Sequence, residues 1–402
     1  MLAVKTTSWR FSVLLALLGI SAAAALFVDA HRGIGEQLSY LKRHQELTFP
    51  ELSHFFSALA KEQGALYAYD VLRRAELPPA TDTHLLAHVV GDALYKERGV
   101  EGMEVCTDEF RNACSHSIVI GVLDGEGEGG LPRIAEACRK APGGRGAYTM
   151  CFHGLGHGVF AYTGYDLEKT LLLCRTTGTE DHHQREYIEC VGGSIMELAG
   201  GGGHDRAGWE RAREKYLNRE DPLSPCNLPF IPGEVQPICY IYLTPLLFAF
   251  ESGEVKNPRE REFNQAFLYC SRLREQENRD ACFSGIGKEL PTLVANRDIR
   301  VIGVLSPDQL QRVALWCALG KNMGGEEPCI RSVAQSLFWG GENDPQAALS
   351  FCSLVGNVQA VCLEELFEIA RTYLSRKDQE NFCNLPRFTD AYKKSCKEKV
   401  YL

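Results

Sequence analysis

The chain has 402 residues, a formal net charge of −9 and an isoelectric point near 5.7. This acidic balance, without a basic stripe that carries interleaved aromatic residues, excludes a nucleic-acid-binding protein. The chain is longer than one conventional hydrophobic core needs, but its length suits a repeat array that grows by stacking.

A charge-free apolar run of 18 residues, Phe11–Val28, follows a short basic N-terminal segment. The run is at the short end for a membrane span and longer than the apolar region of most secretory signals. We therefore expect residues 1–30 to be a signal anchor that crosses the membrane through residues 11–28. The remainder would then face the periplasm or the extracellular space. The alternative is a signal peptide cleaved near Ala30, which would make the protein secreted.

Residues 31–80 contain two amphipathic stretches, Glu51–Gln63 and Ala65–Glu76, which are separated by Gly64 and followed by two prolines. Apolar residues recur in both stretches at helical spacing, and glycine and proline commonly end helices. The segment therefore predicts a cysteine-free, juxtamembrane helical hairpin that joins the anchor to the rest of the chain.

Sixteen cysteines, all within residues 81–402, form eight short-range pairs, with 7 to 15 residues inside a pair and 20 to 35 between pairs. The pairs are Cys106 with Cys114, Cys138 with Cys151, Cys174 with Cys190, Cys226 with Cys239, Cys270 with Cys282, Cys317 with Cys329, Cys352 with Cys362 and Cys383 with Cys396. This alternation is typical of a repeat array with one local disulfide per unit. Such disulfides require an oxidising compartment.

Each unit follows one pattern. A glycine-rich apolar segment comes after the second cysteine of a pair, and a helix such as LPRIAEAC or LEKTLLLC then ends at the first cysteine of the next pair. The pattern predicts an all-α fold of α/α hairpins in which each disulfide joins the end of one helix to the start of the next. Because glycine weakens helices, its recurrence indicates close contact between helices. The apolar run Val235–Phe250 fits a buried helix of this array better than a second membrane span.

Residues 200–237 interrupt the fourth unit with a glycine- and proline-rich segment that contains the charged, helix-like stretch DRAGWERAREKYLNRED. Insertions in repeat arrays map to loops on one face, which is often the binding face.

The strings FAYTGYDLEKTLLLC, LFWGGENDPQAALSFC and GVLDGEGEGGLPRIAEAC resemble Sel1-like repeats, and the spacing of the first cysteine pair is similar to that of the disulfide-rich secreted members of this TPR-like family. The resemblance implies an α/α-hairpin solenoid, wound as a right-handed superhelix, with a concave binding face. It implies no chemistry.

Histidines carry the signal for chemistry. None of the eleven lies beyond position 204, and five recur at matching positions at the starts of three successive long helices. These are His84, His88, His116, His153 and His157. Residues four apart share a helix face, and Asp92 extends the first row by one turn.

Neutral imidazole is a common ligand for Zn, Cu, Fe and Ni. We therefore predict a divalent transition-metal site, with Zn preferred, whose affinity falls as the pH drops through about 6.5. The predicted ligands are His84, His88, Asp92, His116, His153 and His157. The alternative is that the histidines bind backbone carbonyls or one another across tight helix seams without a metal.

Other polar residues rank lower. Glu197 and Glu289 each follow a paired cysteine by seven residues, and could flank the histidines as a general base or a fourth ligand. Solvent-exposed helix positions are the interpretation we favour for both. His182, His183 and His204 are expected in exposed loops. The sequence lacks the motifs of serine hydrolases, HExxH metalloproteases, P-loop proteins and c-type haem proteins.

Three function classes remain. The first is a membrane-tethered, extracytoplasmic α-solenoid that binds a protein or envelope-polymer partner on its concave face and carries a His-lined metal site. The second is an extracytoplasmic metalloenzyme whose His cluster activates water or oxygen. The third, a structural spacer, is disfavoured because the histidines gather at one end. We rank the scaffold first because solenoids mostly bind partners.

Overall fold

The computed structural model describes residues 33–79, 81–107, 109–141, 144–201, 205–250, 258–340 and 343–401. Over these ranges the fold is entirely helical, apart from one isolated bridge between Asn218 and Asp221, so the all-α prediction is confirmed. The expected anchor lies outside the described residues. Within them, no helix combines the length and the apolar character that a membrane span requires.

Both amphipathic stretches of the N-terminal segment form helices, α2 (Phe49–Gln63) and α3 (Ala65–Arg74). Thr48 and Glu51 close a capping box at the start of α2. Gly64 separates the two helices with a φ of 96°, a value that residues with a side chain rarely adopt. A further helix over residues 33–43 precedes them, so the segment is longer by one helix than the expected hairpin.

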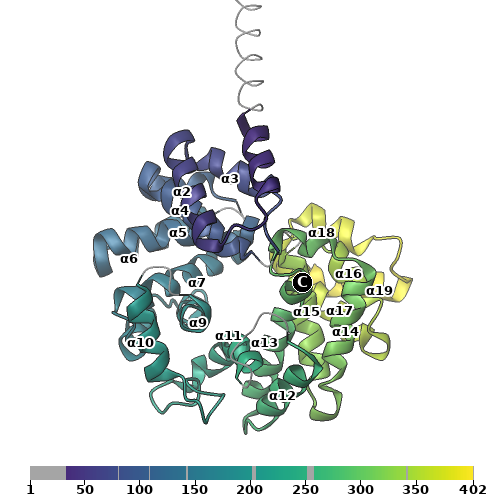
Figure 1. The fold of residues 1–402 in the computed structure, drawn as a ribbon. Coiled ribbons are helices and arrows are strands. Elements are labelled where there is room, and N and C mark those ends of the chain that lie inside the picture. The colour runs from purple at the N-terminus through teal and green to yellow at the C-terminus, as the bar shows by residue number, and fades with distance from the viewer. Residues whose placement is uncertain are drawn as a thin grey trace, which may run out of the picture.

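Long helices then follow one another around a closed ring (Figure 1). They are α4 (Thr83–Arg98), α5 (Glu109–Glu126), α7 (Gly144–Tyr162), α9 (Arg185–Gly200), α11 (Gln236–Ala249), α13 (Gln276–Val294), α15 (Glu326–Gly340), α17 (Gln359–Tyr373) and α19 (Asp390–Val400). Each packs against the next. The apolar run that includes Cys239 and Tyr240 is α11, whose inner residues are buried as predicted.

Shorter helices lie between the long ones, and α10, α12 and α14 are farther from the middle of the ring (Figure 1). They are α6 (Leu131–Lys140), α8 (Leu167–Arg175), α10 (Arg206–Tyr216), α12 (Glu260–Ser271), α14 (Pro307–Ala318), α16 (Gln346–Cys352) and α18 (Arg376–Cys383). The 3-10 segments are η1 (Gly99–Val105), η2 (Gly127–Gly130), η3 (Gly233–Val235), η4 (Ile299–Val304), η5 (Lys321–Met323) and η6 (Gly356–Val358). The charged stretch of the predicted insertion forms α10.

All eight predicted disulfides are formed, with Cα–Cα distances of 5.4 to 5.6 Å. Most join the end of a short helix to the next long helix, as Cys138 of α6 does with Cys151 of α7. Cys106 and Cys226 are exceptions because they lie in non-helical segments. In the chain-entropy model, a bridge that closes such a loop contributes about 3 kcal/mol.

Glycines allow the long helices to approach closely. A Cβ at Gly193 of α9 would lie 1.8 Å from the carbonyl oxygen of His153 on α7, and one at Gly156 would lie 2.0 Å from the carbonyl oxygen of Cys190. No larger residue fits at either position without moving a backbone. The predicted close contact between helices is therefore confirmed.

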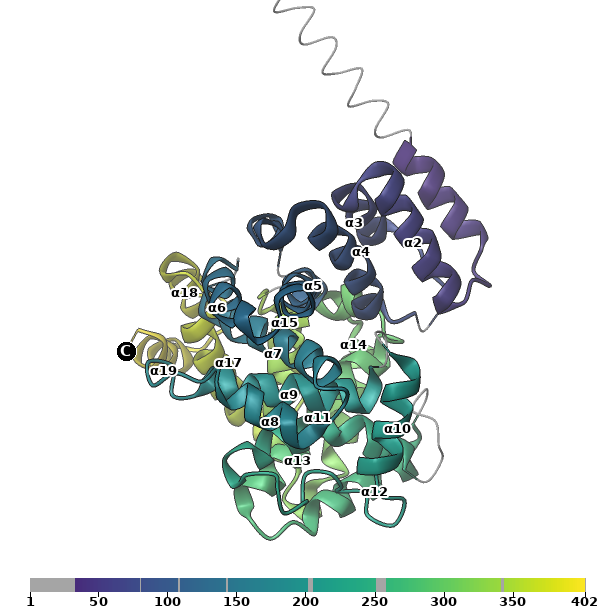
Figure 2. The same cartoon turned by 90° about the vertical axis from the view of Figure 1, so that its left-hand side faces the viewer.

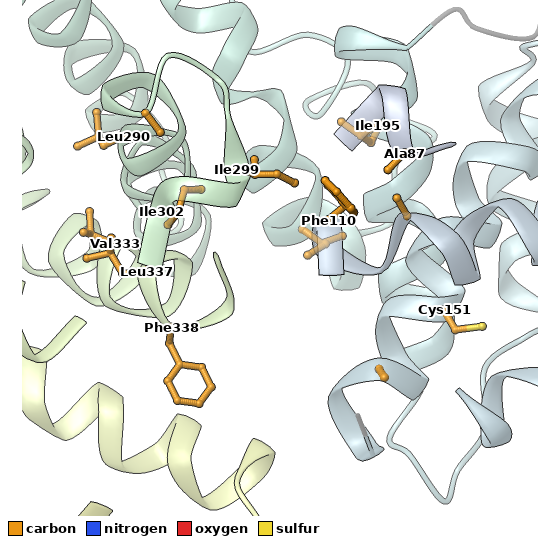
Figure 3. Packing of buried hydrophobic residues seen from close by; sticks show 14 of the residues in the cluster. Ala87, Phe110, Cys151, Ile195, Leu290, Ile299, Ile302, Val333, Leu337 and Phe338 are labelled. Atoms are coloured by element: carbon orange, nitrogen blue, oxygen red, sulfur yellow. The ribbon is translucent and has the colours of Figure 1, made fainter. Parts of the chain in front are cut away.

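Later elements of the array, η4, α15 and α17, contact the early helices α4, α5 and α7. Arg300 donates hydrogen bonds to the carbonyl oxygens of Leu72 (2.8 Å), in the last turn of α3, and of Ala75 (2.7 Å), its C-cap. Ile299 lies on the part of η4 that approaches Phe110, and Val333, Leu337 and Phe338 lie on the neighbouring helix (Figure 3). In the side view, α15 lies near α5 and α17 near α7 (Figure 2), and both pairs of helices are in contact. The array therefore closes, and the N-terminal units are held from both sides.

Candidate metal centre

The five histidines meet where α4, α5 and α7 pack side by side. The ring centroids of His84 and His88 are 4.7 Å apart, and that of His116 lies 5.7 and 5.5 Å from them. The rings of His153 and His157 lie 5.9 and 6.2 Å from His116. Four of the five residues are buried and His88 is half-buried. One continuous cluster of imidazoles results.

Hydrogen bonds determine the tautomers on α4. His84 Nδ1 lies 2.7 Å from the carbonyl oxygen of Phe110, which can only accept, so Nδ1 carries the proton. His88 Nδ1 lies 3.2 Å from Ser117 Oγ, and that hydroxyl donates its own proton to the carbonyl oxygen of His88 at 3.0 Å. His88 Nδ1 must therefore donate as well. In the neutral form, both rings carry their lone pair on Nε2.

Those two Nε2 atoms face each other at 3.2 Å. Two lone pairs at this distance repel, so a proton or a cation must lie between them. Burial lowers the pKa of His84 to about 3, which disfavours the proton near neutral pH. Two imidazole nitrogens bound to a tetrahedral Zn²⁺ at 2.0–2.1 Å lie about 3.3 Å apart, close to the observed separation. The pair has the geometry of two metal ligands.

His116 completes the group from α5. Its side chain is 1% exposed, and neither ring nitrogen has a hydrogen-bond partner among the described residues. Buried polar atoms nearly always have a partner, so this ring is arranged for a ligand. One ligand atom each from His84, His88 and His116 all lie within 4.8 Å of one another, and this group could hold a metal ion.

The chain entering α5 is held in an unusual conformation beside this group. Phe110, Arg111 and Asn112 have φ values of 52°, 54° and 63°, in the left-handed region that non-glycine residues avoid at a cost of about 1 to 3 kcal/mol each. The turn directs the carbonyl of Phe110 at His84. Arg111 secures it by donating a 3.2 Å hydrogen bond to Ser336 Oγ of α15, so closure of the ring supports the site.

Two buried carboxylates of α9 stand behind the histidines of α7. Glu197 Oε2 lies 3.0 Å from His157 Nδ1, and Glu189 Oε2 lies 3.8 Å from His153 Nδ1. Arg185 binds the other oxygen of Glu189 at 2.7 Å. Burial lowers the pKa of His153 to about 4, although the carboxylate opposes this shift. Because burial disfavours protonation of His84, His116 and His153, proton competition at these rings should begin well below the pH of 6.5 expected from the sequence.

The three carboxylates considered from the sequence lie in different surroundings. Asp92 is half-buried on α4 and does not belong to the group whose ligand atoms lie within 4.8 Å. Glu197 is buried against His157, so its interpretation as a solvent-exposed residue was wrong. Glu289 is also largely buried, and it pairs with Lys288. The carboxylates that approach the cluster thus come from α9.

Glu189 is the neighbour of the cluster that sequence reasoning missed. It directly precedes Cys190 and lies two turns before Glu197 on the same helix. The combination of two carboxylates at that separation, in the unit that follows the last histidine pair, was the available signal.

The loop histidines lie apart from the cluster. His183 is exposed, as expected, whereas His182 is half-buried with its ring 4.6 Å from that of Tyr148. His204 lies outside the described residues. Neither described residue joins the group of three ligands.

No protein-family model, curated protein or solved structure matches the chain. The histidine cluster is the feature of the described residues that points to a function.

Proposed function

We propose that the protein is an extracytoplasmic metal-binding protein in which His84, His88 and His116 hold one divalent transition metal. The observation that carries the proposal is the pair of facing Nε2 atoms, 3.2 Å apart, on rings whose Nδ1 atoms both donate. The eight disulfides indicate an oxidising, extracytoplasmic environment.

Zn²⁺ is the metal that these residues fit best. Three imidazoles suit Zn, Cu, Fe and Ni, and three ligands arranged around a tetrahedral ion leave one open position. The protein contributes rigidity: Phe110 and Ser117 fix the orientation of the two rings on α4, while the cysteine bridges fix the helices. Supporting hydrogen bonds of this kind orient metal ligands and increase their basicity.

A metalloenzyme is the second candidate, and the open fourth position favours it. A Zn²⁺ ion with three protein ligands lowers the pKa of a bound water to about 7. Small-anion binding distinguishes the candidates. If the position is accessible, azide added to the cobalt-loaded protein will change its visible spectrum, whereas an inaccessible, purely binding site will leave the spectrum unchanged.

Three further expectations belong to the same proposal. Residues 11–28 anchor the chain in a membrane, the stapled helices form a right-handed Sel1-like superhelix, and its concave face binds a protein or envelope-polymer partner. The disulfides support the proposed extracytoplasmic location of the chain. The repeated pairs of helices support the repeat architecture.

The test is metal content. The full chain, isolated from an oxidising compartment and reloaded with Zn²⁺ after chelation, should retain the ion in the His84–His88–His116 group. The double variant His84→Ala/His88→Ala should lose it while keeping its helical content and its disulfides. The exposed His54 provides the control, because His54→Ala should bind as the wild type does. Equal zinc content in the wild type and the double variant would overturn the proposal.

A further inference from the structure

We infer that the cluster holds a second transition-metal ion, bound by His153 and His157 of α7, with His116 shared between the two positions. The inference rests on the proposed metal function and extends it to a two-ion centre. It also departs from the sequence expectation of a single ion with Asp92 as a ligand.

His157 has the features of a metal ligand. Glu197 accepts the proton of its Nδ1 at 3.0 Å, which leaves the lone pair on Nε2. That Nε2 atom is buried and has no hydrogen-bond partner among the described residues. A carboxylate on one ring nitrogen with a free lone pair on the other is the usual arrangement of a metal-bound histidine. Trp209 fixes α9 here by donating a 2.7 Å hydrogen bond to the carbonyl oxygen of Glu197.

His153 repeats the spacing of the first site. It precedes His157 by four residues, as His84 precedes His88, and the centroids of its ring and of the His157 ring are 5.3 Å apart. Its Nδ1 has no hydrogen-bond partner within the described chain, although Glu189 lies 3.8 Å away. The two carboxylates of α9 offset the positive charge that an ion would bring into a buried site.

His116 connects the two positions. Its ring lies within 6.2 Å of the other four, measured between centroids, and both of its nitrogens lack hydrogen-bond partners in the described residues. One ion on the α4 side engages only one of these nitrogens. A second ion on the α7 side engages the other, with release of the ring proton to water. The shared ring thereby gains partners on both sides.

The two positions differ in how well their ligands are placed. Among the described residues, the 4.8 Å criterion is met by the group with His84 and His88 and by no group with His153 and His157. The second ion therefore needs side-chain movement, and should bind after the first and more weakly. Nearby cations oppose it further, since Lys288 Nζ lies 4.8 Å from the centroid of the Tyr242 ring, which packs on His153.

A zinc titration of the chelator-treated full chain, followed by calorimetry and metal analysis, tests the inference. The wild type should bind two ions in two steps. His153→Ala/His157→Ala should keep only the tight step, and His84→Ala/His88→Ala only the weak one. Glu197→Ala, which spares every ligand, should weaken the second step by about 10- to 100-fold and leave the first unchanged.

The outcomes separate the two proposals. If both the wild type and His153→Ala/His157→Ala bind a single ion, the second position is overturned and the proposed function stands. If the wild type binds no ion, both fail. Sharing is tested with two equivalents of Cu²⁺: spin coupling between the ions supports a bridging His116, and two independent copper signals would overturn it.

Discussion

The histidine-containing seam between α4 and α5 and the histidine-free seam between α13 and α15 solve the same packing problem. In the first, Ser117 Oγ donates to the carbonyl oxygen of His88 at 3.0 Å; in the second, Ser336 Oγ donates to that of Lys288 at 3.0 Å. Glycine permits the close approach in both, as at Gly91 and Gly287. Serine and glycine therefore suffice to join the helices. The imidazoles are not needed for packing, which supports a role in binding a ligand.

The two regions also differ in how histidines make their stability depend on pH. Burial lowers the pKa of His84 to about 3, of His153 to about 4 and of His116 well below its usual value, so the folded protein keeps these rings neutral. The C-terminal helices beyond α10 contain no histidine, so no histidine there lowers stability as the pH drops from 6.5. The loss of stability in acid that comes from histidines is thus confined to the N-terminal half of the molecule.

The largest expected effect comes from His116, because it contributes to both proposed positions. His116→Ala should abolish retention of both ions, measured as zinc per protein after gel filtration. Ser284→Ala in the histidine-free seam, whose hydroxyl donates to the carbonyl oxygen of Pro328, is the matched control and should leave the zinc content unchanged. If His116→Ala retains its full zinc content, the histidine-containing seam is not the metal-binding one.

The second effect is on acid stability of the metal-free protein. Unfolded histidines bind protons near pH 6.5, whereas in the folded protein His84 and His153 have pKa values of about 3 and about 4. The unfolded state therefore binds more protons over this range, and the free energy of unfolding should fall as the pH drops from about 6.5 towards 4. Urea unfolding at several pH values measures this slope. It should flatten in His116→Leu/His153→Leu, and an equally steep slope in that variant would contradict the account.

A smaller effect is expected from removing single disulfides. Replacing Cys138 and Cys151 by serine, or Cys352 and Cys362, should lower the free energy of unfolding by about 3 kcal/mol in either case. Only the first bridge ends on α7, which carries His153, so only its loss should also weaken zinc binding. If loss of either disulfide weakens zinc binding equally, a structural change at one part of the ring of helices reaches the metal site from a distance.

The smallest effect concerns the glycine contacts. Gly193→Ala places a Cβ 1.8 Å from the carbonyl oxygen of His153, and Gly287→Ala places one 2.2 Å from that of Cys329. Each should destabilise the protein by about 1 to 3 kcal/mol through overpacking, measured by thermal unfolding. Only Gly193→Ala displaces α9 and its two carboxylates, so it alone should weaken the second zinc step. If Gly193→Ala leaves the second zinc-binding step unchanged, the carboxylates of α9 do not contribute to that site.

Local patterns in the sequence were sufficient to predict much of the fold. Cysteine spacing gave all eight bridges, and the glycine-rich segments gave the long helices that pack closely. Ring closure was not predictable, because it depends on contacts between distant residues, such as Arg300 with Leu72. The extra N-terminal helix over residues 33–43 was missed as well.

The sequence identified the histidines of the candidate site, but it could not predict how their side chains are arranged. Register between repeats placed the five histidines together, but it could not distinguish one position from two. Asp92 was included because it continues a helical row, whereas Glu189 was omitted because it stands before its cysteine. The bond from His84 to Phe110 depends on the left-handed turn before α5, for which the sequence offered no sign.

Anomalous diffraction at the zinc edge, from crystals of the zinc-loaded full chain, tests whether His84, His88 and His116 bind a metal. We expect a peak at bonding distance from the Nε2 atoms of His84 and His88 and from one nitrogen of His116. Density without an anomalous peak there, with the two Nε2 atoms still in direct contact, would contradict it and make the cluster a network of hydrogen-bonded histidines.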